Sequence, residues 1–433
     1  MSHLSFVNTY SYQTPSVSND IPQASVSTQI TKPAPSSHRI IQAVSQDGTA
    51  TLGSQTTINI QRTANTSIKR SSAMLRFRID VAVPIVAGAA TTFQFANNLR
   101  GASSCIQRLT LSSNSTELEK FDYYSDYHST MVLHGTTTDY VYEVKNYELA
   151  SNVFLCPINV ATSTKTIYVS IPLCSGLLNS DQDYPLYLAP LTLQIGWAPS
   201  LLGVISEAGA AGSSCTNLTF NEISLVYESI EHNIEFLNAQ KQLVAQGNLF
   251  NMGYHSAFSL IKSSEANLLY TIGCGKVSVN GILYQNYPTL ALGASGYRHS
   301  KENTQTDCIV SVDGVPINSF GPMNMQHWAT SVYAEMRRVF GSSYDSDNSS
   351  YNATITMITG DSVVSGTYFT DIFLGGMSLR RTDEAGFVFP GTPVSNLLVQ
   401  LNSTPAAGDT TMFHILFSAV ASFDGQGMVV RTS

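Results

Sequence analysis

Hydrophobic and polar residues alternate along much of the chain beyond residue 73, with the period of two that is typical of a β-strand with one buried face. The clearest case is Met74–Val83, in which every odd position is a large hydrophobic residue and three even positions are charged. A first series of further strands is predicted at Thr92–Ala96, Ile106–Leu111, Tyr140–Val144, Thr166–Leu173, Leu191–Trp197 and Leu218–Tyr227. A second series is predicted at Asn267–Val279, Cys308–Val312, Ala353–Thr359, Tyr368–Leu379, Asn396–Leu401 and Met412–Phe423.

One predicted helix interrupts each series of strands. In the first, Thr116–Val132 follows Ser115, a residue type that favours helix N-caps, and has hydrophobic residues on one face. In the second, Pro322–Phe340 has a Pro in its first turn, a Gly directly after its end, and hydrophobic residues at spacings of three and four. The stretch Glu228–Gly247 is the least strand-like and predicts a helical connector, although its first residues can equally continue the preceding strand.

The chain therefore follows one plan twice, without visible sequence identity between its halves. Each half spans roughly 180 residues, which suits a jelly-roll of two packed sheets, whereas an immunoglobulin-type sandwich needs only about 100. We predict an all-β fold of two tandem eight-stranded jelly-rolls, each with a short helical insertion. They occupy residues 51–232 and 257–433, with a connector at 233–256. Residues 1–50 are rich in Ser, Thr, Gln and Pro and predict an extended N-terminal arm.

Charged residues make up only 12% of the chain, and the formal net charge is −8. Positive charge is not concentrated anywhere: the densest cluster is Arg337-Arg338, and the predicted arm contains only Lys32 and Arg39. Because a protein that neutralises phosphates needs clustered Lys and Arg, we expect no direct nucleic-acid binding. A surface with few charges instead fits a protein that is largely covered by copies of itself.

Residues capable of enzyme chemistry form no known catalytic pattern. The six cysteines are too far apart for a CxxC pair, and buried free thiols explain them best. No HExxH motif occurs, and 273–276 (GCGK) lacks the spacing of a nucleotide-binding loop, so it is interpreted as a hairpin or bulge. Asp122 and Asp126 share a predicted helical face, where solvated carboxylates are a better explanation than a calcium site. We expect no catalytic, cofactor-binding or metal-binding residues, and no enzyme activity.

Several segments have distinctive motifs in a distinctive order. Leu99–Met131 combines a strand with a Tyr-rich segment, and Val169–Ile195 contains the runs IPLCSGLL and PLYLAPLTLQI. With the connector around Ile223–His255 and the ending Phe413–Val430, these segments resemble the double jelly-roll major capsid proteins of tailless icosahedral DNA viruses. The resemblance covers roughly residues 55–433 and is greatest to the shorter forms of small eukaryotic DNA viruses, virophages and polinton-like elements.

The resemblance implies a structural protein of the virion capsid, assembled in the cytoplasm or nucleus of the host cell. In this family three copies form a homotrimer whose six jelly-rolls make a pseudo-hexagonal block, and many trimers tile an icosahedral shell. The implied partners are further copies of the chain, penton and minor capsid proteins and, in several relatives, an internal membrane. Because residues 1–50 are polar and nearly uncharged, we expect this arm to tie neighbouring trimers together rather than to bind the genome.

Three other classes of protein remain open from the residues. The main alternative is a two-domain jelly-roll carbohydrate-binding or adhesion protein. Such proteins are usually exported, whereas the first twenty residues lack the basic and apolar regions of a signal peptide. A small RNA virus capsid commonly has a basic arm, and a carbohydrate-active enzyme needs a pair of catalytic carboxylates that cannot be singled out here.

Overall fold

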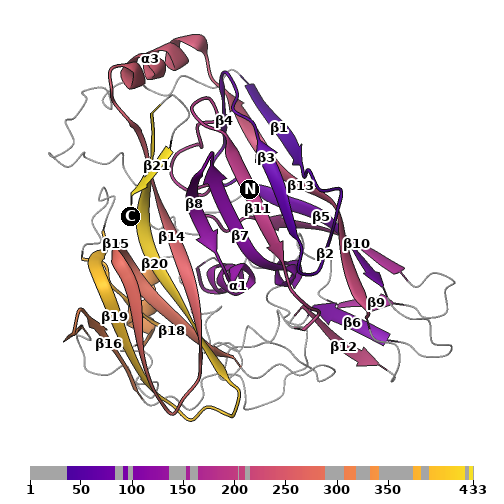
Figure 1. Cartoon of the computed structure of the whole chain (residues 1–433), viewed down its shortest axis with the longest axis vertical. Coiled ribbons are helices and arrows are strands. Elements are labelled where there is room, and N and C mark those ends of the chain that lie inside the picture. The colour runs from indigo at the N-terminus through magenta and orange to yellow at the C-terminus, as the bar shows by residue number, and fades with distance from the viewer. Residues whose placement is uncertain are drawn as a thin grey trace.

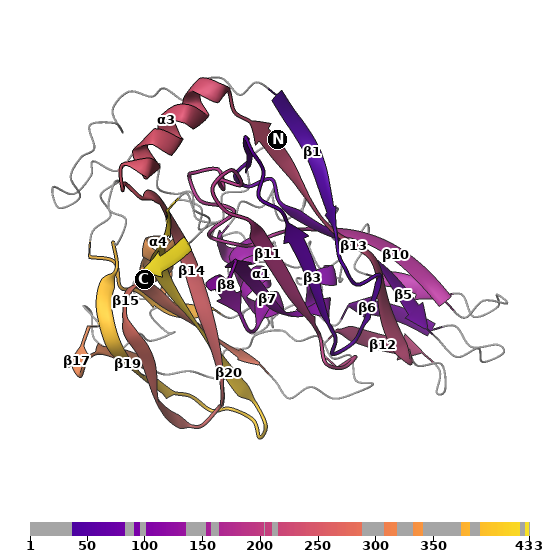
Figure 2. The same ribbon diagram turned by 45° about the horizontal axis from the view of Figure 1, so that its top comes forward.

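The computed structural model describes residues 37–82, 91–95, 101–135, 153–156, 164–202, 204–209, 215–287, 307–317, 332–340, 374–381, 390–424 and 429–432. Their strands form two groups of antiparallel sheets, one built from β1 to β13 and the other from β14 to β21 (Figure 1). The first group, indigo to magenta, lies beside the second, orange to yellow, and helix α3 bridges their upper ends (Figure 2). Among the described helices, none has both the length and the apolar character that a bilayer span requires.

Two large sheets make up the first half of the chain. The first has the order β1-β13-β5-β10 and contains β1 (Ser37–Val44), β13 (Asn217–Glu231), β5 (Met74–Ala82) and β10 (Thr164–Pro172), with β2 (Thr49–Thr51) and β4 (Thr66–Ile68) also on β13. The second has the order β3-β11-β7-β8 and contains β3 (Gln55–Ile60), β11 (Leu191–Trp197), β7 (Ile106–Ser113) and β8 (Thr116–Phe121). A smaller sheet contains β12 (Ile205–Gly209), β6 (Thr91–Phe95) and β9 (Val153–Cys156).

The alternation in the sequence decides which face of each strand is buried. On β5 the buried residues are every second one from Leu75 to Val81, and β11 has the same pattern. The two sheets meet through aromatic rings: Phe77 of β5 makes an edge contact with Trp197 of β11, with 5.1 Å between centroids. Trp197 also stacks on Phe220 of β13 at 4.0 Å. One hydrophobic core therefore fills the space between the two sheets, as in a sandwich.

A single eight-stranded sheet makes up the described part of the second half. Its order is β14-β20-β15-β19-β16-β17, with β18 on β15 and β21 on β20. The strands are β14 (Phe250–Ser263), β20 (Thr410–Phe423), β15 (Asn267–Tyr287), β19 (Thr392–Asn402), β16 (Asp307–Val312), β17 (Val315–Pro316), β18 (Gly375–Ser378) and β21 (Val429–Thr432). The beginning of β15 pairs with β19 and its end with β20, so this one long strand joins the two parts of the sheet.

Four helices accompany the sheets in the described residues: the 3-10 helix η1 (Gly101–Cys105), α1 (Tyr124–Gly135), α3 (Ile234–Ala245) and α4 (Val332–Phe340). Helix α3 forms the predicted connector, and Asn233 caps it by accepting a hydrogen bond from the Phe236 backbone N–H. Residues 228–231 continue β13, which is the second possibility that the sequence left open. Helix α4 confirms the last part of the predicted helix Pro322–Phe340, and residues 322–331 lie outside the described residues.

The predicted helix Thr116–Val132 is wrong in its first third. Thr116–Phe121 is strand β8, which pairs with β7, and only Tyr124–Gly135 is helical. Asn114 adopts a positive φ of 52° in the two-residue turn between these strands. Because Asn tolerates this conformation, the chain reverses into a hairpin at Ser115, where the sequence pattern suggested a helix N-cap.

The remaining predicted strands are confirmed where the structure describes them. Within the predicted Tyr368–Leu379, the strand is β18 alone, since residues 368–373 are not described. The predicted strands Tyr140–Val144 and Ala353–Thr359 also lie outside the described residues. The expected bulge at 273–276 is present, because the pairing of β15 with β19 shifts register between Gly273 and Val277.

The first sheet begins within the segment predicted as an N-terminal arm. Strand β1 pairs with β13 over eight residues, and both His38 and Lys69 pair with Glu228 of β13. Burial contributes little to β1, since Ile40 is 80% exposed. Backbone hydrogen bonds therefore hold this strand, which a search for buried hydrophobic patterns does not detect. Residues 1–36 of the predicted arm lie outside the described residues.

Candidate functional site

The two halves of the chain meet along strand β8. The hydroxyl of Tyr254 on β14 donates a hydrogen bond of 2.6 Å to the backbone carbonyl of Leu118. The hydroxyl of Thr116 donates one of 2.8 Å to the carbonyl of Val429 on β21. A strand of the first half is thus hydrogen-bonded to two strands of the second, which fixes the position of one half against the other.

Helix α1 forms the other side of this contact and lies between the two halves in Figure 1. Its Thr130 hydroxyl donates a hydrogen bond of 2.8 Å to the side-chain oxygen of Gln285 on β15. Tyr127 makes an edge contact with the ring of His414 on β20, with 5.9 Å between centroids. The face of the second-half sheet that carries these residues is consequently buried, as Gln285 and His414 are both inaccessible to solvent.

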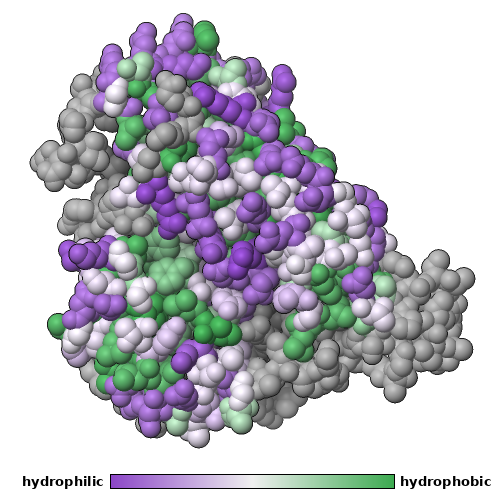
Figure 3. Space-filling model, in the orientation of Figure 1, coloured by the Kyte–Doolittle hydropathy of each residue, from purple (hydrophilic) through white to green (hydrophobic). Residues whose placement is uncertain are grey.

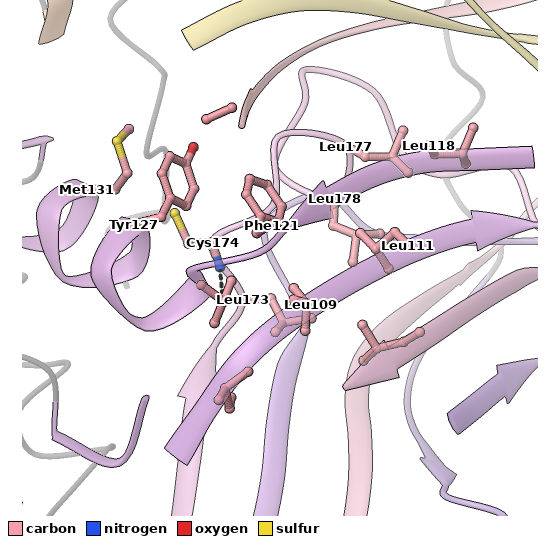
Figure 4. Packing of buried hydrophobic residues seen from close by; sticks show 14 of the residues in the cluster. Leu109, Leu111, Leu118, Phe121, Tyr127, Met131, Leu173, Cys174, Leu177 and Leu178 are labelled. Atoms are coloured by element: carbon pink, nitrogen blue, oxygen red, sulfur yellow. Dashed lines mark hydrogen bonds between the residues drawn. The ribbon is translucent and has the colours of Figure 1, made fainter. Parts of the chain in front are cut away.

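Hydrophobic packing supports the same region from inside the first half. Figure 4 shows Tyr127 and Met131 of α1 to the left of Phe121, with Cys174 and Leu173 close by. The rings of Phe121 and Tyr127 stack with 4.8 Å between their centroids. The helical insertion of the first half is therefore part of its core and is held rigidly where it contacts the second half.

Glu119 of β8 is fully buried at this contact. One carboxyl oxygen accepts a hydrogen bond of 2.9 Å from the Gly176 backbone N–H, and the other is hydrogen-bonded to the Ser175 hydroxyl. Desolvation raises the pKa of Glu119 from 4.5 to about 7, and hydrogen bonds with Ser175, the Leu177 backbone, Ser256 and the Gly176 backbone limit the rise. Glu119 is thus a buried acid that changes charge close to neutral pH.

A β-bulge is what turns Glu119 inward. Ser112 of β7 opposes Glu117, whereas Leu111 opposes Glu119, so Leu118 is an extra residue in β8. Without this extra residue, Glu119 would oppose Thr110 and lie on the outer face, because a shift of one residue moves a side chain to the other side of a sheet. The buried position of Glu119 is therefore a consequence of the fold.

The segment that receives Glu119 lies directly against β14. A Cβ atom added to Gly176 would lie 1.4 Å from the carbonyl oxygen of His255 and 2.5 Å from its carbonyl carbon. Only a glycine fits at such a distance from the backbone of another strand. Leu118, Glu119 and Gly176 thus place β8, the 173–179 segment and β14 in one tightly packed unit.

The described residues give little support for a nucleophilic or metal-binding site. Five cysteines are confirmed as buried free thiols, namely Cys105, Cys174, Cys215, Cys274 and Cys308. Burial raises the pKa of Cys274 to about 11 and that of Cys308 to about 12, so these thiols stay protonated. In the described part of the chain, no three His, Cys, Asp or Glu residues are grouped as a metal ion would require.

Asp122 and Asp126, which were considered from the sequence as possible calcium ligands, have structural roles. Asp122 forms ion pairs with Arg108 at 2.8 Å and with Lys120 at 3.8 Å. Asp126 is buried in the first turn of α1, where the Ser129 hydroxyl donates a hydrogen bond to its backbone carbonyl. Neither residue belongs to a group of three or more possible metal ligands in the described part of the chain.

Sequence reasoning missed Glu119, which it placed on a predicted helix. The signals for its position are the Asn114 turn and the bulge at Leu118, and neither is visible as a hydrophobic pattern. The dipeptide Ser175-Gly176 likewise gives no indication in the sequence that it contacts β14. This contact between the two halves is built by loops and an irregularity in a strand.

Large hydrophobic side chains are also exposed on the outer faces and edges of both halves. In the first half these are Ile40 and Val44 of β1 and Tyr168 of β10, and in the second Leu269 of β15 and Val315 of β17. Figure 3 shows hydrophobic and hydrophilic residues intermixed over the face that it presents. A surface of this kind, with few charges and scattered apolar side chains, suits contacts with other proteins.

A scan against protein-family models and a search of curated protein sequences give no match. The structure is nevertheless similar to that of the PBCV-1 protein VP54 fitted into a reconstruction of the virophage Sputnik, with a TM-score of 0.59 and 10% identity over 94% of this chain and 98% of that one. It is similar to a chain of the Sputnik virophage, with a TM-score of 0.56 and 10% identity over 94% and 90%. It is also similar to the faustovirus major capsid protein, with a TM-score of 0.53 and 8% identity over 90% of this chain and 91% of that one.

These likenesses extend over both halves of the chain and confirm the fold expected from the sequence. The described sheets, the helix in each half and the connector α3 agree with it. The sequence identity is far too low to carry over any residue. The chain has the double jelly-roll fold of viral major capsid proteins.

Proposed function

We propose that this protein is the major capsid protein of a non-enveloped icosahedral virus. The observation that carries this proposal is the fold similarity, which covers 94% of this chain and 98% of VP54. Two jelly-rolls fixed side by side by β8 and α1 form a rigid block, as a shell subunit requires. The described cysteines are buried, and Asp122 forms an ion pair with Arg108. These surroundings fit a structural role without enzyme activity.

The working unit that we propose is a homotrimer with a pseudo-hexagonal outline, and such trimers tile the shell. Six jelly-rolls from three copies supply the six sides of this outline. The low charged fraction of 12% and the exposed Ile40, Tyr168 and Leu269 support extensive contacts between copies. Obligate interfaces of this kind commonly bury more than about 2,000 Å².

Further partners follow from this role and are part of the proposal. Penton and minor capsid proteins would adjoin the trimers in the virion, and an internal membrane would lie beneath the shell if one is present. Direct nucleic-acid binding is not proposed, because the chain has a net charge of −8 and no cluster of basic residues. The two jelly-rolls would comprise residues 51–232 together with β1, and residues 257–433 together with the first part of β14. The residues preceding β1 would be the arm that ties neighbouring trimers together.

Analytical ultracentrifugation of the full-length protein tests the proposed trimer. We expect a single species with three times the mass of the 46.8 kDa chain at micromolar concentration, with no dissociation on tenfold dilution. High salt should leave this species intact, since few charges contribute to its contacts. A stable monomer at the same concentration would contradict the trimer.

A further inference from the structure

A buried carboxyl group joins three segments at the contact between the two halves. Glu119 comes from β8, its hydrogen-bond partners Ser175 and Gly176 from the loop after β10, and His255 of β14 closes over Gly176. The first two segments belong to the first half and β14 belongs to the second. A change in the charge of Glu119 therefore affects the contact between the two jelly-rolls.

We propose that Glu119 is a proton-controlled clamp, whose neutral carboxyl group holds the 173–179 segment tightly against β14 and whose ionisation loosens the contact between the two jelly-rolls. The Ser175 hydroxyl donates to one carboxyl oxygen and the Gly176 N–H donates to the other, and the backbone of Leu177 and the Ser256 hydroxyl are further hydrogen-bond partners of the group. When the proton leaves to solvent, these neutral partners face a full buried charge. Their hydrogen bonds do not offset the loss of hydration, so water is drawn towards the carboxylate.

Glu119 is fully buried, and the loop that binds it is packed directly against β14. Gly176 lies so close to His255 that even a Cβ atom would not fit between them. The Ser175 oxygen also accepts from the Leu178 N–H at 3.2 Å, which ties the loop to itself. Hydration of the Glu119 carboxylate therefore requires that the loop and β14 move apart. The two halves of the protein separate slightly at this point as a result.

The other titratable groups around Glu119 keep one charge state in the relevant range. Desolvation raises the pKa of Tyr127 on α1, Cys174 in the loop and Tyr254 on β14, so all three stay neutral. Burial, reinforced by Arg380, lowers the pKa of His255 to about 3, and this imidazole is neutral as well. Arg431 of β21 acts on Tyr254 and stays positive throughout. Of the groups named here, Glu119 is the one whose pKa lies near 7.

The direction of the pH effect follows from the higher pKa of Glu119 in the folded protein. The folded state holds its proton up to about pH 7, whereas an unfolded chain releases it near 4.5. The stabilisation is therefore fully present below pH 4.5, decreases as the pH rises, and is lost above pH 7. Between pH 5 and pH 8 the unfolding equilibrium constant attributable to this group should increase on the order of a hundredfold.

Hydrogen–deuterium exchange of the full-length protein at pH 5.5 to 8.5, corrected for intrinsic rates, tests the clamp. We expect the protection of residues 173–179 and of β14 around His255 to fall through pH 7 in the wild type. The variant Glu119→Gln keeps a neutral side chain of the same shape, so its protection should not change with pH. Glu117→Gln, on the same strand but exposed, is the matched control and should behave like the wild type.

Wild-type protection that does not change across pH 7, or a Glu119→Gln variant that keeps the wild-type pH dependence, would overturn the proposal. If Glu119→Gln does not fold, Ser175→Ala provides the second test. Loss of a donor to the carboxylate should raise the pKa of Glu119 and move the loss of protection to higher pH. A midpoint that does not move in this variant contradicts the clamp. The result is independent of the capsid role, which the mass of the assembled species decides.

Discussion

Replacing Gly176 with alanine is expected to lower the free energy of unfolding by about 4 kcal/mol or more, a loss reserved for severe structural conflicts. The added Cβ would lie 1.4 Å from the His255 carbonyl oxygen, which belongs to the backbone of β14. That strand cannot yield locally, because it pairs with β20 along all fourteen of its residues. The whole edge of the second half would have to shift, and the Glu119 hydrogen bonds would be lost with it.

Chemical denaturation followed by circular dichroism measures this effect, and the yield of soluble protein supports it. Gly273→Ala is the matched control, since a Cβ at this exposed position meets no atom within 4 Å. The control should change the free energy of unfolding by less than about 1 kcal/mol. A Gly176→Ala variant as stable as this control would show that β8, the loop and β14 are not packed as described.

Replacing Trp197 with alanine is expected to cost about 3–5 kcal/mol of stability, the usual range for removal of a large buried aromatic residue. The indole is only 2% exposed and stacks on Phe220 at 4.0 Å, with Phe77 at its edge. Its N–H donates a hydrogen bond of 2.8 Å to the fully buried Thr56 hydroxyl. The substitution therefore removes the contact between the two sheets of the first half and also leaves a buried polar group without this partner.

Denaturant titration of full-length Trp197→Ala and Tyr168→Ala separates burial from aromatic character. Tyr168 is a large aromatic residue of β10 that is 67% exposed, so its loss should cost less than about 1 kcal/mol. Equal effects of the two substitutions would contradict a core centred on Trp197.

The clearest of the correctly predicted strands are those in which alternating burial determines the conformation. Met74–Ala82 and Leu191–Trp197 alternate without interruption, and both pack with their hydrophobic faces against the same core. Where another cause decides, the pattern fails. Strand β1 is held by pairing with β13, and Thr116–Phe121 becomes a strand because the chain reverses at Asn114.

The position of Glu119 could not be predicted for a related reason. A single extra residue, Leu118, changes the side of the strand on which Glu119 lies. A hydrophobic pattern does not reveal such a bulge. The partners of Glu119, Ser175 and Gly176, are also 56 and 57 positions away in the sequence. Long-range contacts between loops depend on the completed fold. The order of motifs along the chain, in contrast, predicts the double jelly-roll fold, and the structure confirms it.

Electron microscopy of the purified full-length protein tests the capsid role most directly. We expect particles with threefold symmetry and a pseudo-hexagonal outline, in which each copy supplies two adjacent jelly-rolls joined at β8 and α1. At higher concentration these particles should associate side by side into curved sheets or closed shells. Particles of single chains, or an assembly without six jelly-rolls around a threefold axis, would contradict the proposal that this double jelly-roll is the building block of a viral shell.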